Sequence, residues 1–93
     1  MKIKKRVHVI YEGRVQGVGF RYTAVVLAKE FHITGWVKNL YDASEVELVA
    51  EGDFAQLNLF LVKIKRDMSR YIVNENIEWE EYQGSFDGFD IRF

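Results

Sequence analysis

The sequence predicts an α+β domain in which two helices cover one face of a sheet. In four short segments, apolar residues alternate with polar ones, which is the pattern of half-buried strands. Two longer segments instead repeat apolar residues every three or four positions, as helices with one buried face do. These segments follow one another as strand, helix, strand, strand, helix and strand, and a short last strand closes the chain.

The first half of the chain predicts a strand, a glycine-bearing loop, a helix and a second strand. Residues 7–13 alternate in polarity, and the loop 13–19 follows them. Apolar residues then recur at helical spacing over residues 21–31, and Gly35 ends the connection that comes after them. Residues 36–39 are therefore interpreted as the second strand.

The second half predicts a hairpin, another helix and two more strands. Asp42 and Ser44 mark a turn, and the alternation over residues 46–51 predicts a third strand that folds back on the second. Asp53 is a suitable helix N-cap, and Gln56 lies three positions later, as in a capping box. The apolar stripe of this helix consists of Phe54, Leu57, Leu61, Ile64 and Met68, and the last two strands span residues 77–80 and 89–93.

The order of these elements predicts the ferredoxin-like, or split βαβ, fold. Each helix has one apolar stripe, and a single sheet with one apolar face can bury both stripes. With right-handed crossovers, the order gives an antiparallel sheet with two helices on one face, here with a short extra C-terminal strand. We expect residues 1–93 to form a single stand-alone domain, because the chain begins at Met1 and ends with a complete strand. The fold hosts many functions and assigns none of them.

Composition narrows the classes of function. The net charge of −1 gives no general attraction to nucleic acid or membrane. The chain has no cysteine for a disulfide or a thiol nucleophile, and no apolar run approaches the ~18 residues that span a bilayer. We therefore expect a soluble, cytoplasmic monomer with no nucleic-acid or membrane partner. The basic residues near the N-terminus are interpreted as a solvated arm: Lys2, Lys4, Lys5 and Arg6.

The loop 13–19 has the features of an anion site. It joins a strand end to a helix start, where unpaired backbone N–H groups carry partial positive charge. Gly17 and Gly19 can adopt positive φ and turn successive N–H groups towards one ligand. Arg21 would lie in the first helical turn, where a cation is mildly unfavourable unless an anion binds beside it. From these residues alone, a tight turn followed by an ordinary surface arginine remains an open interpretation.

The same segment resembles a signature of a known family. The first signature of the acylphosphatases is similar, over its whole length, to Gly13-Arg14-Val15-Gln16-Gly17-Val18-Gly19-Phe20-Arg21. The second begins like Gly35-Trp36-Val37-Lys38-Asn39, which lies at the family's spacing from the first. The element order agrees, as does the closing Phe89-Asp90-Ile91-Arg92-Phe93, so the resemblance covers essentially the whole chain.

The resemblance implies an activity and a site. The activity is hydrolysis of a small-molecule acyl phosphate to a carboxylate and inorganic phosphate, with no metal and no cofactor. Arg21 matches the residue that binds the phosphoryl group, and Asn39 matches the residue that positions the attacking water. If the last strand lies near the loop, the Phe93 carboxylate could also steady Arg21. The backbone amides that hold the phosphate oxygens would be those of Val15, Gln16, Gly17, Val18, Gly19 and Phe20.

The hairpin after Asn39 departs from the family pattern. Ala43 stands where the family has glycine, Tyr41 where proline is common, and one extra residue precedes Val46. This departure bears on turnover and substrate access more than on phosphate binding. It also leaves an alternative function open, a non-enzymatic module that binds a phosphorylated metabolite on the same fold.

Other interpretations are less well supported by the residues. RNA-recognition modules share this element order, but the predicted third strand has no aromatic residue for base stacking and the first has only Tyr11. His8 and His32 have no ligand-spaced partner in the sequence, so both are interpreted as structural. The acidic residues of the fourth strand are interpreted as a solvated face: Glu78, Glu80 and Glu81.

Overall fold

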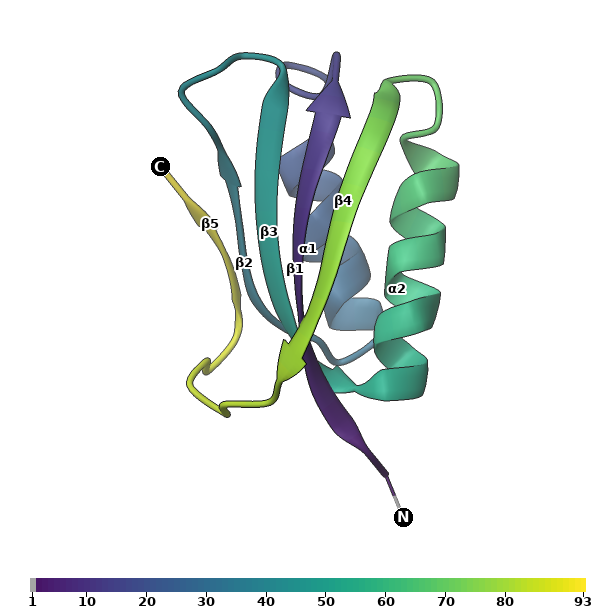
Figure 1. The fold of residues 1–93 in the computed structure, drawn as a ribbon, viewed down its shortest axis with the longest axis vertical. Coiled ribbons are helices and arrows are strands. Elements are labelled where there is room, and N and C mark those ends of the chain that lie inside the picture. Colours follow the sequence, from purple (N-terminus) through teal and green to yellow (C-terminus); the bar gives the residue numbers. More distant parts are fainter. Residues whose placement is uncertain (1) are drawn as a thin grey trace.

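The structure is a computed structural model that describes residues 2–93 (Figure 1). The order of its helices and strands is the one that the sequence predicts. No helix in this part of the chain combines the length and the apolar composition needed to cross a membrane. The elements are β1 (Lys4–Gly13), α1 (Phe20–Glu30), β2 (Thr34–Asn39), β3 (Glu45–Asp53), α2 (Phe54–Asp67), β4 (Ile72–Glu81) and β5 (Phe89–Arg92).

The strands form one sheet in the order β4-β1-β3-β2-β5, and both helices lie on the same face of it (Figure 1). The pairs β1–β3, β1–β4 and β2–β3 are antiparallel, as predicted. The short extra C-terminal strand, β5, pairs in parallel with β2, so the complete sheet is mixed. The connection explains this parallel pairing, because β4 runs opposite to β2 and residues 82–88 reverse the chain while crossing to the far edge of the sheet.

The core lies between the sheet and the helices. Val7, Val9 and Tyr11 of β1 are fully buried, as their alternation requires. The stripe predicted for α2 is wrong at its first member, because Phe54 is 42% exposed and packs edge-on against Trp79 instead. The buried residues of the two helices are Phe20, Ala24, Leu27, Ala28, Leu57, Phe60, Leu61 and Ile64.

Strand β1 is longer than the alternation indicated. Lys4, Lys5 and Arg6 were interpreted as a solvated arm, but they are strand residues that pair with β3. The Arg6 guanidinium lies 3.4 Å from the buried Glu51 carboxylate and 3.1 Å from that of Glu80. The alternation of polar and apolar residues could not identify residues 4–6 as strand, because the carboxylates that pair with Arg6 come from distant positions in the sequence.

Glu51 also holds the connection between β4 and β5. Its carboxylate accepts hydrogen bonds from the backbone N–H of Gln83, at 2.7 Å, and of Gly84, at 3.1 Å. A carboxylate that is only 1% exposed needs such partners to offset the loss of hydration. These contacts fix the start of the path that brings β5, and with it Ile91, to the edge of the sheet beside β2.

Asp53 caps α2, as the sequence predicts. Its side chain accepts hydrogen bonds from Ala55 N at 2.9 Å and from Gln56 N at 3.3 Å. These bonds satisfy two N–H groups that have no partner within the helix. Within residues 2–93, the Gln56 side chain makes no return bond to the backbone of Asp53, so the second half of the capping box is not formed.

Asp53→Ala is therefore expected to lower the free energy of unfolding by about 1 kcal/mol, the usual contribution of such a cap. Urea denaturation followed by circular dichroism measures this value. Asp87→Ala, in the exposed connection before β5, is the control for loss of one carboxylate. Equal stabilities of the two variants would contradict the assignment of the cap.

Candidate active site

Three segments meet at one end of the sheet (Figure 1). They are the loop between β1 and α1, the end of β2 with the hairpin turn into β3, and the end of β5. Backbone hydrogen bonds tie the loop to its neighbours, since Gly13 N donates to Ser44 O and Arg14 N to Tyr71 O, each at 2.9 Å. The two sequence signatures are therefore brought together by the fold.

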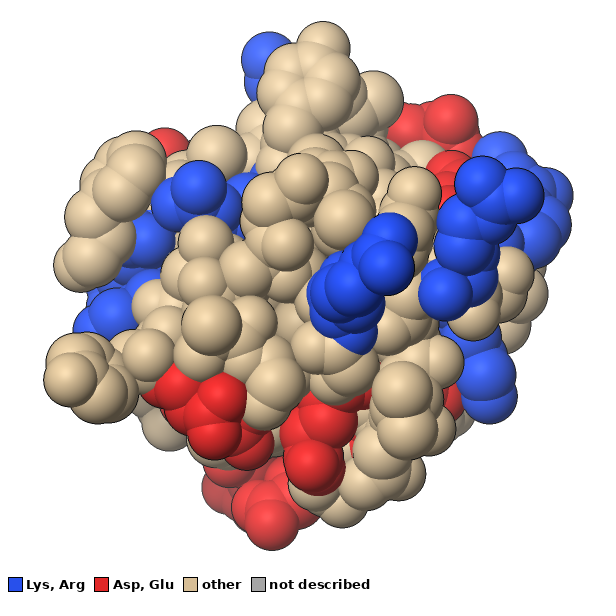
Figure 2. Space-filling model, turned by 90° about the horizontal axis from the view of Figure 1, so that it is seen from above, with Lys and Arg blue, Asp and Glu red and all other residues tan. Residues whose placement is uncertain are grey.

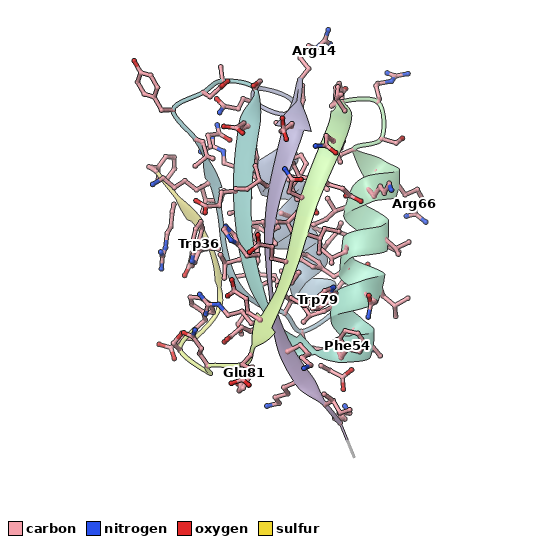
Figure 3. All side chains as sticks on the ribbon, in the orientation of Figure 1. Arg14, Trp36, Phe54, Arg66, Trp79 and Glu81 are labelled. Atoms are coloured by element: carbon pink, nitrogen blue, oxygen red, sulfur yellow. The ribbon has the colours of Figure 1, made fainter. Side chains whose placement is uncertain are left out.

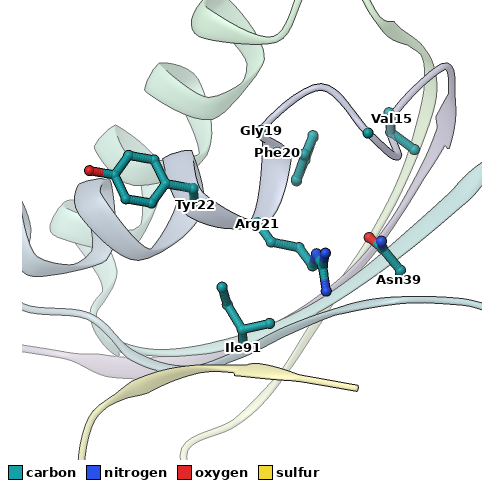
Figure 4. Close-up of a pocket in the computed structure, with 8 residues that line it drawn as sticks. Val15, Gly19, Phe20, Arg21, Tyr22, Asn39 and Ile91 are labelled. Carbon is teal, nitrogen blue, oxygen red and sulfur yellow. The ribbon is translucent and has the colours of Figure 1, made fainter.

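A pocket of about 170 Å³ opens between these segments (Figure 4). Arg21 and Asn39 both line it, and their side chains point towards one another. The two residues predicted to be catalytic thus share one cavity, although they belong to α1 and β2. The complete lining is Val15, Gly17, Gly19, Phe20, Arg21, Tyr22, Asn39 and Ile91.

The loop enters α1 through two glycines in the left-handed region. Gly17 has a φ of 76°, and Gly19, the N-cap residue of α1, has a φ of 81°. A Cβ added at either position would meet no atom within 4 Å, so the backbone conformation and not space favours glycine. No side chain in the described part of the chain caps α1, and its first turn has no acidic residue. The first N–H groups of the helix are therefore available to an anion.

Arg21 is the one cation that lines the pocket within residues 2–93. Its Cζ atom lies 5.3 Å from the centroid of the Phe93 ring, a cation–π contact. The expectation that the Phe93 carboxylate steadies Arg21 is wrong, because no carboxylate of the described residues forms an ion pair with this guanidinium. A ring leaves the N–H groups of the guanidinium available to a ligand. Arg14, by contrast, directly follows β1 and projects outward from the end of that strand (Figure 3).

Asn39 is the last residue of β2. Its Oδ1 atom is buried and accepts no hydrogen bond from the part of the chain that the structure describes. A buried carbonyl without a partner lowers stability by about 1–3 kcal/mol, so its position requires a reason. A small ligand with an O–H or N–H group would satisfy it.

Two of the six loop residues have side chains directed away from the pocket. Gln16 and Val18 are not among its lining residues. The Gln16 side chain donates to carbonyls of the hairpin between β2 and β3, and Val18 packs against the core. The prediction for both residues concerned their backbone N–H groups, so it stays a prediction.

Two lining residues were not predicted from the sequence. Tyr22 is 71% exposed and follows Arg21 directly. Its position beside Arg21 in the first helical turn is the one feature of the sequence that could have placed it at the pocket. Ile91 comes from β5, whose parallel pairing with β2 the alternation could not reveal.

Below the loop, the rings of Tyr11 and Phe20 pack with centroids 4.8 Å apart. Burial raises the pKa of the Tyr11 hydroxyl well above its ordinary value, so this group stays protonated.

Outside the pocket, cross-strand pairing places His8 among carboxylates on the sheet face opposite the helices. His8 Nε2 lies 2.7 Å from Glu47 Oε2, and His8, Glu78 and Glu80 offer ligand atoms within 4.8 Å of one another. The fold thus gives His8 carboxylate neighbours, and its interpretation as a structural residue stays a prediction. Its neighbours come from β3 and β4, which spacing along the sequence does not indicate.

The end of the molecule that carries the pocket exposes side chains of both charges (Figure 2). Lys and Arg residues form groups separated by uncharged surface, and Asp and Glu lie along the lower edge of the view and beside Lys and Arg at its upper right. A continuous positive surface, which is the usual footprint of nucleic-acid binding, is therefore not formed on this face by the residues described.

Fold and pocket together define a class, the ferredoxin-like domains whose pocket holds an arginine from the first turn of the first helix and an asparagine from the end of the second strand. The acylphosphatase family model matches residues 7–91. An acylphosphatase of Caldanaerobacter subterraneus subsp. tengcongensis is 43% identical over 91 residues, which cover 96% of this chain and 99% of that relative. The chain belongs to the acylphosphatase family.

Solved structures agree with this assignment. The crystal structure of acylphosphatase from Bacillus subtilis superposes with a TM-score of 0.84 at 30% identity, covering 96% of this chain and 99% of that one. Full-length HypF in its phosphate- and nucleotide-bound form gives a TM-score of 0.89 at 24% identity. That match covers all of this chain but 12% of HypF, and it shows the fold alone.

Proposed function

We propose that this chain hydrolyses acyl phosphates to a carboxylate and inorganic phosphate in the pocket between β1, α1 and β2. One observation carries the proposal: a single pocket joins the uncapped start of α1, the Arg21 guanidinium and the unpaired Oδ1 of Asn39. Membership of the acylphosphatase family supports this activity and does not favour the non-enzymatic alternative.

In this proposal, Arg21 and the backbone amides of residues 15–20 hold the phosphoryl group. The planar guanidinium can grip two phosphate oxygens at once. Gly17 and Gly19 are both left-handed, and we expect these conformations to turn neighbouring N–H groups towards one centre, next to the positive end of α1. A cation in a first helical turn is unfavourable by about 0.3–1 kcal/mol, and a bound anion reverses the sign of that effect.

Asn39 positions the water that attacks phosphorus. Its Oδ1 accepts a hydrogen bond from the water, and its Nδ2 can donate to a phosphate oxygen. A water held in this way is already oriented for attack, so the free-energy barrier no longer includes the entropy cost of bringing water and phosphorus together. The bond between the water oxygen and phosphorus forms while the bond between phosphorus and the acyl oxygen breaks. The leaving group is a carboxylate, which needs no proton.

The proton of the water is assigned to a phosphate oxygen of the substrate. Within residues 2–93, no aspartate, glutamate or histidine lines the pocket. The enzyme therefore offers no ordinary general base at the reacting atoms. A pH–rate profile governed by a carboxyl or imidazole group of the protein would contradict this assignment.

Release of inorganic phosphate from benzoyl phosphate tests the proposed function. The purified chain should hydrolyse this substrate well above the spontaneous rate. Activity should be the same in EDTA, because the proposed chemistry uses only groups of the protein. Loss in EDTA with recovery on adding a divalent cation would contradict a metal-independent reaction. Binding of phosphate without any hydrolysis would favour the non-enzymatic module instead.

The proposal extends to the setting of the reaction. Residues 1–93 act as one acylphosphatase domain, as a cytoplasmic monomer, on a small molecule and without a nucleic-acid or membrane partner. The net charge of −1 and the lack of cysteine support this setting. Light scattering should give the mass of one chain, and a mass of two or more chains would contradict the monomer.

A further inference from the structure

The side chain of Gln16 connects the loop of the pocket to the hairpin turn that follows Asn39. Its Nε2 atom lies 2.9 Å from Leu40 O, 3.2 Å from Asp42 O and 2.9 Å from Glu45 O. Carbonyl oxygens only accept hydrogen bonds, so the amide nitrogen must be the atom that faces them. Its two N–H groups are shared among the three carbonyls, and the amide therefore fills the centre of the turn.

The turn has few other contacts that fix its shape. Leu40 N donates to Glu45 O at 3.1 Å, and Glu45 N donates to Asp42 O at 3.0 Å. Ser44 donates to Asp42 Oδ1 through its N and its Oγ, and these bonds hold the pKa of Asp42 below its usual value. Within residues 2–93, the one further hydrogen bond between the loop and the turn runs from Gly13 N to Ser44 O.

Packing contributes little at the tip of this turn. Residues 41–44 are all exposed, and Tyr41 has no side-chain burial at all. An exposed segment of this kind opens easily unless hydrogen bonds restrict it. The amide of Gln16 is the side chain that reaches into the turn from the loop, so it restricts the turn from within.

We propose that Gln16 is a positioning residue for the hydrolysis, setting Asn39 relative to the phosphate-binding loop through the hairpin 40–45. This inference rests on the proposed function. The carbonyl of Leu40 belongs to the peptide between Leu40 and Tyr41, so its bond to Gln16 fixes the chain one residue beyond Asn39. Gln16 itself lies within the loop 15–20. One side chain therefore links the segment that holds phosphorus to the residue that holds the water.

Gln16→Met removes the donor and keeps the length of the side chain. The expected result is a fall in kcat for benzoyl phosphate of about tenfold to a hundredfold, because a misplacement of about 1 Å can have that effect. The inhibition constant of inorganic phosphate should change by less than about threefold, since Arg21 and the loop amides are retained. Gln56→Met, which makes the same chemical change in α2 outside the pocket and the turn, is the matched control and should leave both values unchanged.

The double variant Gln16→Met/Asn39→Ala separates positioning from general damage. Because Gln16 acts through Asn39, its loss should lower kcat by less than about twofold once Asn39 is absent. An equal loss in both backgrounds would overturn the proposal, as would a kcat of Gln16→Met within about twofold of the wild type. If Gln16→Met does not fold, Gln16→Asn takes its place, because its amide is too short to reach the carbonyls.

Hydrogen exchange tests the contact without catalysis. The hydrogen-bonded amides of the turn, those of Leu40, Ser44 and Glu45, should exchange about tenfold faster in Gln16→Met than in the wild type or in Gln56→Met. Unchanged exchange there would overturn the proposed link. A wild-type protein that does not hydrolyse benzoyl phosphate would refute the proposed function, whereas the exchange result would still decide whether Gln16 holds the turn.

Discussion

Replacing Arg21 with alanine is expected to lower kcat/KM for benzoyl phosphate by about a thousandfold or more, the range found for arginines that stabilise a transferring phosphoryl group. Within residues 2–93, Arg21 is the one cation of the pocket, so no neighbour can replace its charge. Inhibition by inorganic phosphate should be lost at the same time, because the guanidinium holds the phosphate in the substrate and in the product. Steady-state kinetics with and without phosphate measure both effects.

Stability should hardly change in Arg21→Ala, which distinguishes a lost site from a lost fold. Removing the cation relieves a helix-dipole repulsion of about 0.3–1 kcal/mol. It also removes the contact with the Phe93 ring, which contributes about 0.5–1 kcal/mol. Arg14→Ala is the matched control, since Arg14 is exposed on the same loop and does not line the pocket. Equal activity of Arg14→Ala and Arg21→Ala would contradict the assignment.

Asn39→Ala is expected to lower kcat by about a hundredfold to a thousandfold while inhibition by phosphate persists. The water loses the acceptor that orients it, whereas Arg21 and the loop amides still bind the anion. The free energy of unfolding should stay the same or rise, because the substitution removes a buried carbonyl that has no partner in the described residues. Parallel measurements of kcat, phosphate inhibition and urea denaturation test the three statements.

A surface asparagine provides the control for Asn39. Asn76→Ala removes a side chain from the exposed strand β4, where it donates to Glu12 Oε1 at 3.1 Å. Activity of this variant should match the wild type. An Asn39→Ala variant that turns over as fast as Asn76→Ala would exclude the role given to Asn39. Loss of phosphate inhibition in Asn39→Ala would assign the residue to binding rather than to the water.

Much of the fold could be predicted from polarity alone. The alternation of Val7, Val9 and Tyr11 identified residues 7–13 of β1 correctly, because each of these side chains is buried against the helices. The same reasoning failed where charged side chains are held by distant partners. Arg6 lies inside β1 and pairs with the buried Glu51, a contact that appears only when β1 and β3 lie side by side.

The candidate site was predictable where a residue type had a local reason. The sequence shows two glycines before a helix and an arginine in its first turn. The structure places Gly19 and Arg21 in one pocket. The parallel pairing of β5, which brings Ile91 to the pocket, has no local signal. Nor does the side chain of Gln16, whose partners lie in a turn formed much later in the chain.

A titration of isotope-labelled protein with inorganic phosphate, followed by amide chemical shifts, tests the central claim most directly. We expect the largest shifts at the backbone amides of residues 15–21, saturating with one phosphate per chain and absent in Arg21→Ala. Shifts that are largest elsewhere, for example on the sheet face around His8, would contradict the account. So would a loop that gives no response to phosphate at concentrations where an acyl phosphate is hydrolysed.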